Sequence, residues 1–359
     1  MKRPRPLAIL LALALLAGCQ RQPRFVPAAA DSSAVPVDSL AIAVRTIAQR
    51  WDAGEGEEAA RLTARLVLSD LRMRLKDEPR ASWEERARAL LDSLDAGVEV
   101  ASAPCAMVVD LFARSNPEAG SWPWLYWCSG SEILAQPIEG NGMNVLGMAS
   151  RGLFGASSTA PPQVPEGIAV LYGRRAAGGQ QPVLMAWRAA RGDRWELAQT
   201  LGPDSLGGVG AGEFRAVDDT TVELATRTWK AARGFDECAT CPHVFASHRF
   251  RWGLAGFERV EDRVRPAPYA TFVQLIQAMT AGDRESALRL VSDGAVLEQA
   301  RRAEWNLVRG PWRAAPAADE TPHEMVFFRG TTEAWKVRFD RRGEEWMVAG
   351  LSPTTRAIE

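Results

Sequence analysis

The chain has 359 residues, of which 47% are hydrophobic and 24% are charged, a balance typical of folded globular domains. Its 43 basic and 44 acidic residues are interleaved along the sequence and give a formal net charge of −1. This pattern excludes the clustered basic surface that nucleic-acid binding requires, and the length suffices for two or three domains with their own cores.

The first residues, MKRPRPLAILLALALLAGC, have the features of an export signal. Basic side chains near the amino terminus precede the apolar run Leu7–Ala17, and small residues follow it before Cys19. The run is much shorter than the roughly 20 residues that cross a bilayer as a helix. We therefore expect residues 1–18 to be a signal peptide that is removed.

The segment Leu16-Ala17-Gly18-Cys19 resembles the lipobox of bacterial lipoproteins. The resemblance implies cleavage before Cys19, diacylation of its thiol and acylation of its freed amine, with palmitate among the expected acyl chains. The membrane is then a partner through the lipid anchor. In a Gram-negative cell, Gln20 after the lipidated residue implies transfer to the outer membrane, with the folded body facing the periplasm.

Residues 19–36 are rich in Pro, Ala, Ser and Gln, a composition typical of a flexible tether. Helical spacing of apolar residues then predicts three short helices within a helical region over residues 37–97. The third begins at Ser82-Trp83-Glu84-Glu85, which fits a capping box.

From residue 98 to 265 the apolar period changes to two, which predicts an antiparallel β-rich domain. A sandwich or meander is favoured, and a propeller of few blades is the alternative. Asp218-Asp219 and Gly253–Gly256 supply hairpin turns, whereas residues 139–166 have little periodicity and are expected to form a long loop. The predicted strands are Ala106–Val109, Trp122–Cys128, Gly167–Tyr172, Pro182–Arg188, Arg194–Thr200, Thr221–Arg227, His243–Trp252 and Phe257–Asp262.

Residues 266–359 are predicted to form an α+β domain. Apolar spacing predicts a helix that ends at Gly282, a second capped by Asp283, and a third over Ala295–Trp305. Strands follow, and Arg341-Arg342-Gly343 is expected to be the turn between the last two.

The motifs Pro268-Tyr269-Ala270-Thr271-Phe272-Val273, Ala281-Gly282-Asp283 and Trp346-Met347-Val348 resemble the nuclear transport factor two-like, or cystatin-like cone, domains. The resemblance covers about the last quarter of the chain and implies a cone-like fold with a concave sheet. Because members of this fold include enzymes, ligand binders and inert modules, it does not imply an activity.

Four cysteines remain after Cys19: Cys105, Cys128, Cys238 and Cys241. In an oxidising compartment an even set predicts disulfides, and three pairings are open. We favour Cys105–Cys128 with Cys238–Cys241 because each pair is local. The CxxC spacing also raises thiol redox or metal chemistry, but strand-like sequence follows it, and neither a second CxxC nor a paired histidine supplies further metal ligands.

Trp122, Trp124 and Tyr126 alternate in one predicted strand and are expected to be core, with sugar stacking by an exposed face as the alternative. The glycine-rich run 207–212 lacks the context of a phosphate loop and is expected to be a turn. His248 is expected to be a semi-buried residue with its hydrogen bonds satisfied. His323-Glu324 lacks the second histidine of a zinc protease motif, because Phe327 occupies that position.

No catalytic, cofactor or metal set is complete in the sequence. It therefore favours a non-catalytic envelope lipoprotein that binds or assembles with an envelope protein or glycan and needs no cofactor. The first alternative is a small-ligand-binding protein or enzyme that uses a pocket in the cone-like domain. The second is a thiol oxidoreductase at Cys238 and Cys241.

Overall fold

The computed structural model describes residues 37–74, 83–92, 96–113, 120–130, 132–140, 143–151, 166–190, 193–217, 221–238, 240–253, 255–316 and 322–355. The predicted signal peptide, the predicted lipidation site Cys19 and the predicted tether lie outside the described residues. So do Ser82 of the expected capping box and the expected turn at Asp218-Asp219.

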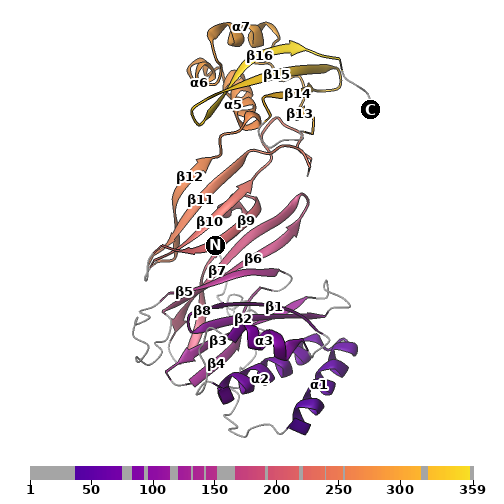
Figure 1. The fold of residues 1–359 in the computed structure, drawn as a ribbon, viewed down its shortest axis with the longest axis vertical. Helices are drawn as coiled ribbons and strands as arrows, with labels where there is room; N and C mark the ends of the chain where they lie inside the picture. Colours follow the sequence, from indigo (N-terminus) through magenta and orange to yellow (C-terminus); the bar gives the residue numbers. More distant parts are fainter. Residues whose placement is uncertain are drawn as a thin grey trace, which may run out of the picture.

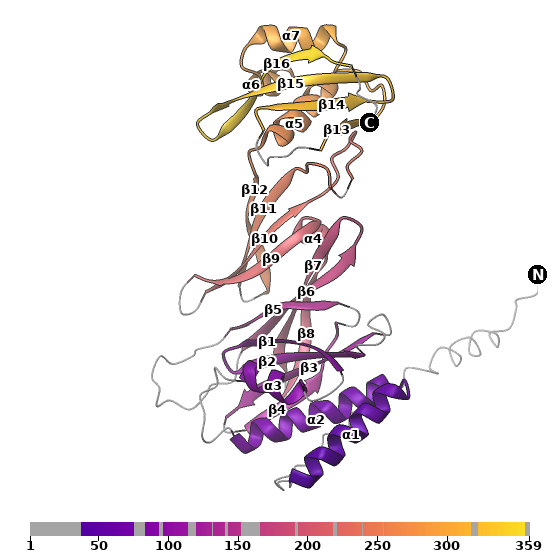
Figure 2. The same ribbon diagram turned by 45° about the vertical axis from the view of Figure 1, so that its right-hand side comes forward.

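The body is an elongated stack with helices at one end, three sheets in the middle and an α+β unit at the other end (Figure 1). Helices α1 (Val37–Asp52), α2 (Gly56–Arg74) and α3 (Trp83–Leu91) cover the first sheet. Each of the four sheets has four antiparallel strands, and in each the order in space is the order along the chain. Every sheet is therefore a meander, and the stack is visible from a second side in Figure 2.

The four sheets are built as follows. The first contains β1 (Ala96–Ala103), β2 (Ala106–Ala113), β3 (Ser121–Ser129) and β4 (Glu132–Pro137), and the second β5 (Asn144–Arg151), β6 (Gly167–Ala176), β7 (Gly179–Ala190) and β8 (Arg194–Leu201). The third contains β9 (Val209–Ala216), β10 (Val222–Trp229), β11 (Phe245–Trp252) and β12 (Phe257–Val264), and the fourth β13 (Trp312–Ala314), β14 (Glu324–Arg329), β15 (Glu333–Arg342) and β16 (Glu345–Pro353).

Alternating side chains allow the sheets to pack on both faces. In β2, Met107 and Val109 pack beneath the helices, whereas Val108 belongs to the core between the first and second sheets. In β6, Val170 faces that same core and Leu171 faces the core shared with the third sheet. Strands buried on both faces read as continuous apolar runs, which is the pattern of the β6 sequence.

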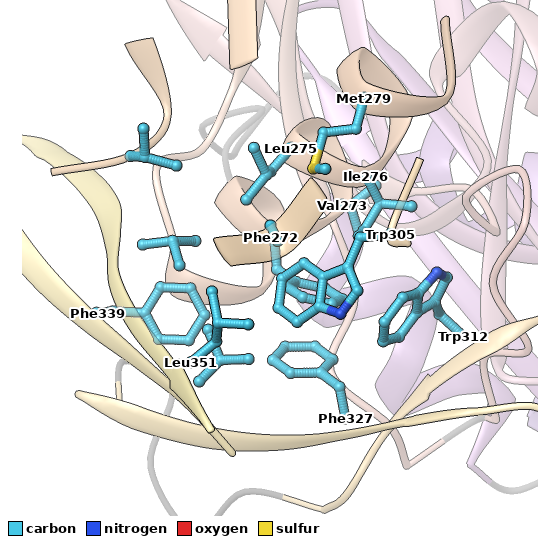
Figure 3. Packing of buried hydrophobic residues seen from close by; sticks show 14 of the residues in the cluster. Phe272, Val273, Leu275, Ile276, Met279, Trp305, Trp312, Phe327, Phe339 and Leu351 are labelled. Carbon is cyan, nitrogen blue, oxygen red and sulfur yellow. The ribbon is translucent and has the colours of Figure 1, made fainter. Parts of the chain in front are cut away.

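The C-terminal unit packs helices α5 (Pro268–Ala281), α6 (Arg284–Arg289) and α7 (Gly294–Arg302) against the fourth sheet. Its core is aromatic, and Phe272 of α5 stacks on Phe327 of β14 with ring centroids 3.6 Å apart (Figure 3). Trp305 is fully buried and meets Trp312 edge to face at 5.4 Å. The face of the sheet that the helices cover is thus filled by side chains.

The third C-terminal helix is shorter than the sequence suggests. Helix α7 ends at Arg302, and Glu304 adopts a positive φ of 57°. This reverses the chain and directs Trp305 into the core, where a continued helix would not have placed it. The other two C-terminal helices end at or begin beside the predicted Gly282 and Asp283, and Asp283 accepts the Ser286 N–H as expected of a cap.

The middle region is mostly β as predicted, but residues 98–265 form no single sheet and no closed propeller in the described part of the chain. The long loop predicted over residues 139–166 is wrong for residues 144–151, which form β5. Its pairing with β6 shifts register between Val145 and Gly147, so the residues do not alternate regularly. Strands β1, β4 and β13 were not predicted as strands either, and β13 has only three residues.

The glycine-rich run is also more regular than predicted. Only Gly207 and Gly208 form a turn, and the rest belongs to β9. Gly210 has a φ of 149°, and a Cβ there would lie 2.1 Å from the Arg227 carbonyl oxygen of β10. Gly210 is therefore required for the close approach of β9 to β10. Glycines placed in a strand for this reason look, in the sequence, like the glycines of a loop.

Arg329 is buried and holds the end of α7. Its guanidinium donates to the carbonyl oxygens of Ala303 (3.0 Å) and Glu304 (2.7 Å) and to the Glu333 carboxylate (2.9 Å for Nε). With 2% of the residue exposed, water cannot replace these bonds.

We expect Arg329→Met to lower the free energy of unfolding by about 3 kcal/mol or more, because it leaves the Ala303 and Glu304 carbonyl groups without this donor and leaves Glu333 only the Trp335 indole at 3.3 Å and Arg309 at 3.9 Å. Arg338→Met, at an exposed position of β15, is the matched control and should change it by about 0.5 kcal/mol or less. Urea unfolding followed by tryptophan fluorescence measures both. Equal effects of the two variants would contradict this account.

Candidate functional site

The third sheet and the C-terminal unit are joined by the segment 230–244, which connects β10 to β11. Phe235 forms a parallel bridge with Trp312, and the main chain bonds in both directions, from Asp236 N to Trp312 O (2.8 Å) and from Trp312 N to Gly234 O (2.9 Å). The Phe235 ring meets Tyr269 and Phe272 edge to face. The segment therefore connects two strands of the third sheet, but its Phe235 side chain packs in the C-terminal core.

Glu237 is the buried acid of this junction, with 1% of its side chain exposed. Its carboxylate accepts the Tyr269 hydroxyl at 2.8 Å and the Ala232 N–H at 3.3 Å, and it lies 3.0 Å from His243 Nδ1. The His243 ring stacks on Trp229 at 3.5 Å. Burial and, secondarily, Glu237 raise the pKa of Tyr269 far above its usual range, so the phenol remains a donor.

Cys238 and Cys241 are joined by a disulfide within this segment, which is the pairing that the sequence favours. Cys238 is exposed and Cys241 is buried. No described helix begins at the pair, so no helix dipole acts on the sulfur atoms. The disulfide closes the turn that follows Glu237.

The predicted Cys105–Cys128 disulfide is not formed in the structure. Cys105 directly precedes β2 and Cys128 belongs to β3; Cys128 N donates to Cys105 O at 3.0 Å, and both residues are buried. The sequence therefore located the two residues correctly as neighbours.

The aromatic stripe of β3 faces the helices. Trp122 contacts Trp51 of α1 at 5.6 Å, Trp124 packs against the same core, and Tyr126 is fully buried with its hydroxyl donating to Ala64 O at 3.2 Å. Tyr126 is thus a core residue, and Trp122 and Trp124 are partly buried rings that pack against the same core.

A pocket of about 390 Å³ lies beside the junction, between the third sheet and the C-terminal unit. We call it the junction pocket. Its walls come from α4 (Pro203–Leu206) and the turn after it, from the ends of β10 and β11, from β12 and from α5. Pockets of this size at domain boundaries are typical sites for small molecules.

His248 of β11 lines the junction pocket and is 6% exposed. Its Nδ1 lies 3.1 Å from Asp262 Oδ1, but neither Nδ1 nor Nε2 has a partner in hydrogen-bond geometry among the described residues. Burial lowers the pKa of His248, and the Asp262 carboxylate opposes this only in part. The expectation of a fully satisfied imidazole is therefore wrong, and the ring is neutral at pH 7.

Two ion pairs flank the junction pocket. Arg259 lies 3.2 Å from Asp262 and also donates to the Ser205 carbonyl oxygen, while Lys230 Nζ lies 3.4 Å from Asp204 Oδ1 and donates to the Asp204 carbonyl at 3.0 Å. Sequence analysis did not predict this grouping, because its members are spread over some sixty positions and meet only in the folded chain.

A second buried titratable group lies between the first and second sheets. Asp110 of β2 is 1% exposed and stands directly opposite Glu99 of β1. Burial, and to a smaller extent the Glu99 charge, raise the pKa of Asp110 to about 7, although the Ser121 side chain opposes the shift. Burial also raises the pKa of Glu99. Sequence analysis missed this acid, because one carboxylate within an apolar strand is not a motif.

The charged and titratable groups facing Asp110 are Glu99, Tyr172 and, near Glu99, Arg88 and Arg175. No group of three or more His, Cys, Asp or Glu residues suited to a metal ion occurs among the described residues. None of the helices that the structure describes is long and apolar enough to cross a membrane.

Comparison with known protein families finds no matching family, and comparison with curated proteins finds no match.

Replacing Gly207 should displace the side chains that line the junction pocket. Gly207 has a φ of 99°, and a Cβ there would lie 2.1 Å from Thr228 Oγ1 and 2.3 Å from His248 Nε2. We expect Gly207→Ala to cost about 2 kcal/mol or more in unfolding free energy, as measured by urea unfolding. Gly202→Ala at the other end of α4 meets no atom within 4 Å and has a φ of −80°, so it should be nearly neutral. Equal loss in both would disprove the steric argument.

The raised pKa of Asp110 predicts that removing its charge stabilises the protein. Because the folded-state pKa lies above the ordinary 3.8, the folded state binds this proton more tightly, and its stability falls as pH rises from about 4 through 7. Asp110→Asn should therefore stabilise the protein by up to roughly 4 kcal/mol at about pH 8 and little at about pH 4. Unfolding curves at both pH values measure this, with exposed Asp340→Asn as control. A gain that is independent of pH would contradict the argument.

Proposed function

We propose that the protein is a lipid-anchored scaffold of the bacterial cell envelope that holds its C-terminal unit away from the membrane for binding or assembly. The observation that supports this most directly is the shape of the body. Helix α1, the first described element after the tether, lies at one end of the stack, and the C-terminal unit lies at the other (Figures 1 and 2).

The proposed anchor is Cys19, at the start of a tether that ends at residue 36. Fully extended, residues 19–36 reach up to roughly 60 Å. The helical end of the stack is then the end nearest the membrane. The residue after Cys19 is Gln20 and not Asp. By resemblance to the sorting of lipoproteins in Gram-negative cells, this supports the outer membrane as the location.

Rigid spacing is the physical property that the stack provides. The first and second sheets share one core, the second and third share another, and segment 230–244 connects the third to the C-terminal core. Each layer is therefore fixed to the next by buried apolar contacts and not by a flexible linker.

We propose that the C-terminal unit is a cone-like domain that acts as a binding module. Three helices followed by an antiparallel sheet support this assignment. An internal ligand pocket, as in the alternative of a small-molecule binder or enzyme, has less support, because Phe339 and Trp346 lie in the filled core with Trp335 packed against it. The thiol oxidoreductase alternative has less support because the disulfide closes a structural turn.

Replacing Cys19 tests the anchor. Cys19→Ala should move the protein from the membrane to the soluble envelope fraction and abolish incorporation of labelled palmitate, because the thiol that carries the proposed lipid is removed. Cell fractionation with immunodetection measures this, and Cys238→Ala serves as a cysteine control that keeps the anchor. A Cys19→Ala protein that stays with the membrane and still incorporates palmitate would refute the proposed anchoring.

Photo-crosslinking from the two ends tests the scaffold in the same cells. A crosslinker at Val308, 83% exposed in the C-terminal unit, should capture an envelope partner, whereas one at Ile42, 62% exposed on α1, should not capture that partner. Capture of the same protein from both positions, or turnover of a substrate by the purified chain, would count against a spacing role.

A further inference from the structure

We propose that the junction pocket, together with the cavity beside it, binds a short peptide with a free terminal carboxylate. This inference concerns a site of its own and does not require the lipid anchor. It rests on the shape of the two cavities, on the polar groups between them and on the charge at one end.

The two cavities are neighbours that share a boundary. The junction pocket has a volume of about 390 Å³, and the second cavity, toward α6, has a volume of about 460 Å³. Gln274 and Gln277 of α5 line both. An occupant that extends from one cavity to the other must pass these side chains.

Gln274 and Gln277 have the chemistry to hold a peptide main chain. A primary amide offers both a donor and an acceptor, which complement the C=O and N–H of a peptide group. Neither side-chain amide is hydrogen-bonded to another residue in the described parts of the chain. The two side chains are three residues apart in α5, so they lie on the same face of the helix.

Lys230 supplies the counter-charge for the carboxylate. Arg259 is held by Asp262 and by the Ser205 carbonyl, and its guanidinium lies over the Phe250 ring at 5.3 Å. Lys230 is about half exposed, and of the three donors of its ammonium group one goes to the Asp204 carbonyl and a second faces the Asp204 carboxylate at 3.4 Å, which leaves one for a new acceptor. It is therefore the cation of the junction pocket that can take a new acceptor.

The remaining wall explains why a peptide is a better occupant than a bare anion. Val244, Ala246, Val264 and Val273 provide apolar surface for a peptide side chain, and His248 lies beside them as a buried ring whose Nε2 lacks a partner. A buried polar atom without a partner costs free energy that folding alone does not recover, and such groups are common at binding sites.

Isothermal titration calorimetry on the full chain in detergent tests the proposal with trialanine, trivaline, trialanine amide and free alanine. At least one free tripeptide should bind with a Kd of about 1 mM or tighter. Trialanine amide and free alanine should bind at least about tenfold more weakly than the corresponding free tripeptide, because each lacks one set of contacts.

Variants assign the contacts. Lys230→Gln should weaken tripeptide binding at least about tenfold and should abolish the difference between trialanine and its amide, whereas Gln277→Leu should weaken both alike. Lys336→Gln, which removes a lysine paired with Glu324 on the fourth sheet, should bind as the parent does. Thermal unfolding confirms that each variant is folded.

The proposal is overturned if neither free tripeptide gives saturable binding at about 10 mM. It is also overturned if free alanine binds as tightly as the tripeptides, or if Lys230→Gln keeps the full preference for a free carboxylate. Because these readouts are independent of fractionation and crosslinking, failure here leaves the scaffold proposal standing, and the reverse is equally distinguishable.

Discussion

The second sheet buries both of its faces, and the other layers are arranged around this constraint. Val170 of β6 requires the first sheet on one side, and Leu171 requires the third sheet on the other. Because the hydrophobic effect scales with the apolar area removed from water, neither neighbour can be lost without exposing an entire face. The outer face of the first sheet is also apolar, and helices α1, α2 and α3 cover it. An elongated body results, since each layer needs the next one.

The junction at segment 230–244 extends this logic to a different kind of unit. The fourth sheet fills its helix-covered face with aromatic side chains, so that face is not available to the third sheet. Instead the connection is made by one inserted ring, Phe235, by a bridge to β13, and by the buried Glu237 carboxylate. This connection leaves space beside it. The junction pocket borders segment 230–244, and both cavities border helix α5.

Sequence patterns predicted the helices, most strands and the order of the regions, because each depends on local periodicity and turn chemistry. They failed at β5, where a register shift at Gly147 breaks alternation, and at β9, where close strand approach demands glycine. Neither buried acid nor the junction pocket was predictable. Asp110 owes its raised pKa mainly to burial, and His248 packs against Gly207, which lies far away in sequence.

The meander order of every sheet has a consequence for biogenesis. Within each sheet, every strand pairs only with strands that are its neighbours in sequence. Local pairing carries a small loop-closure cost and favours rapid formation. For a chain that crosses a membrane from its amino end, the layers can therefore assemble one after another as they emerge, with each finished sheet serving as the surface on which the next one condenses.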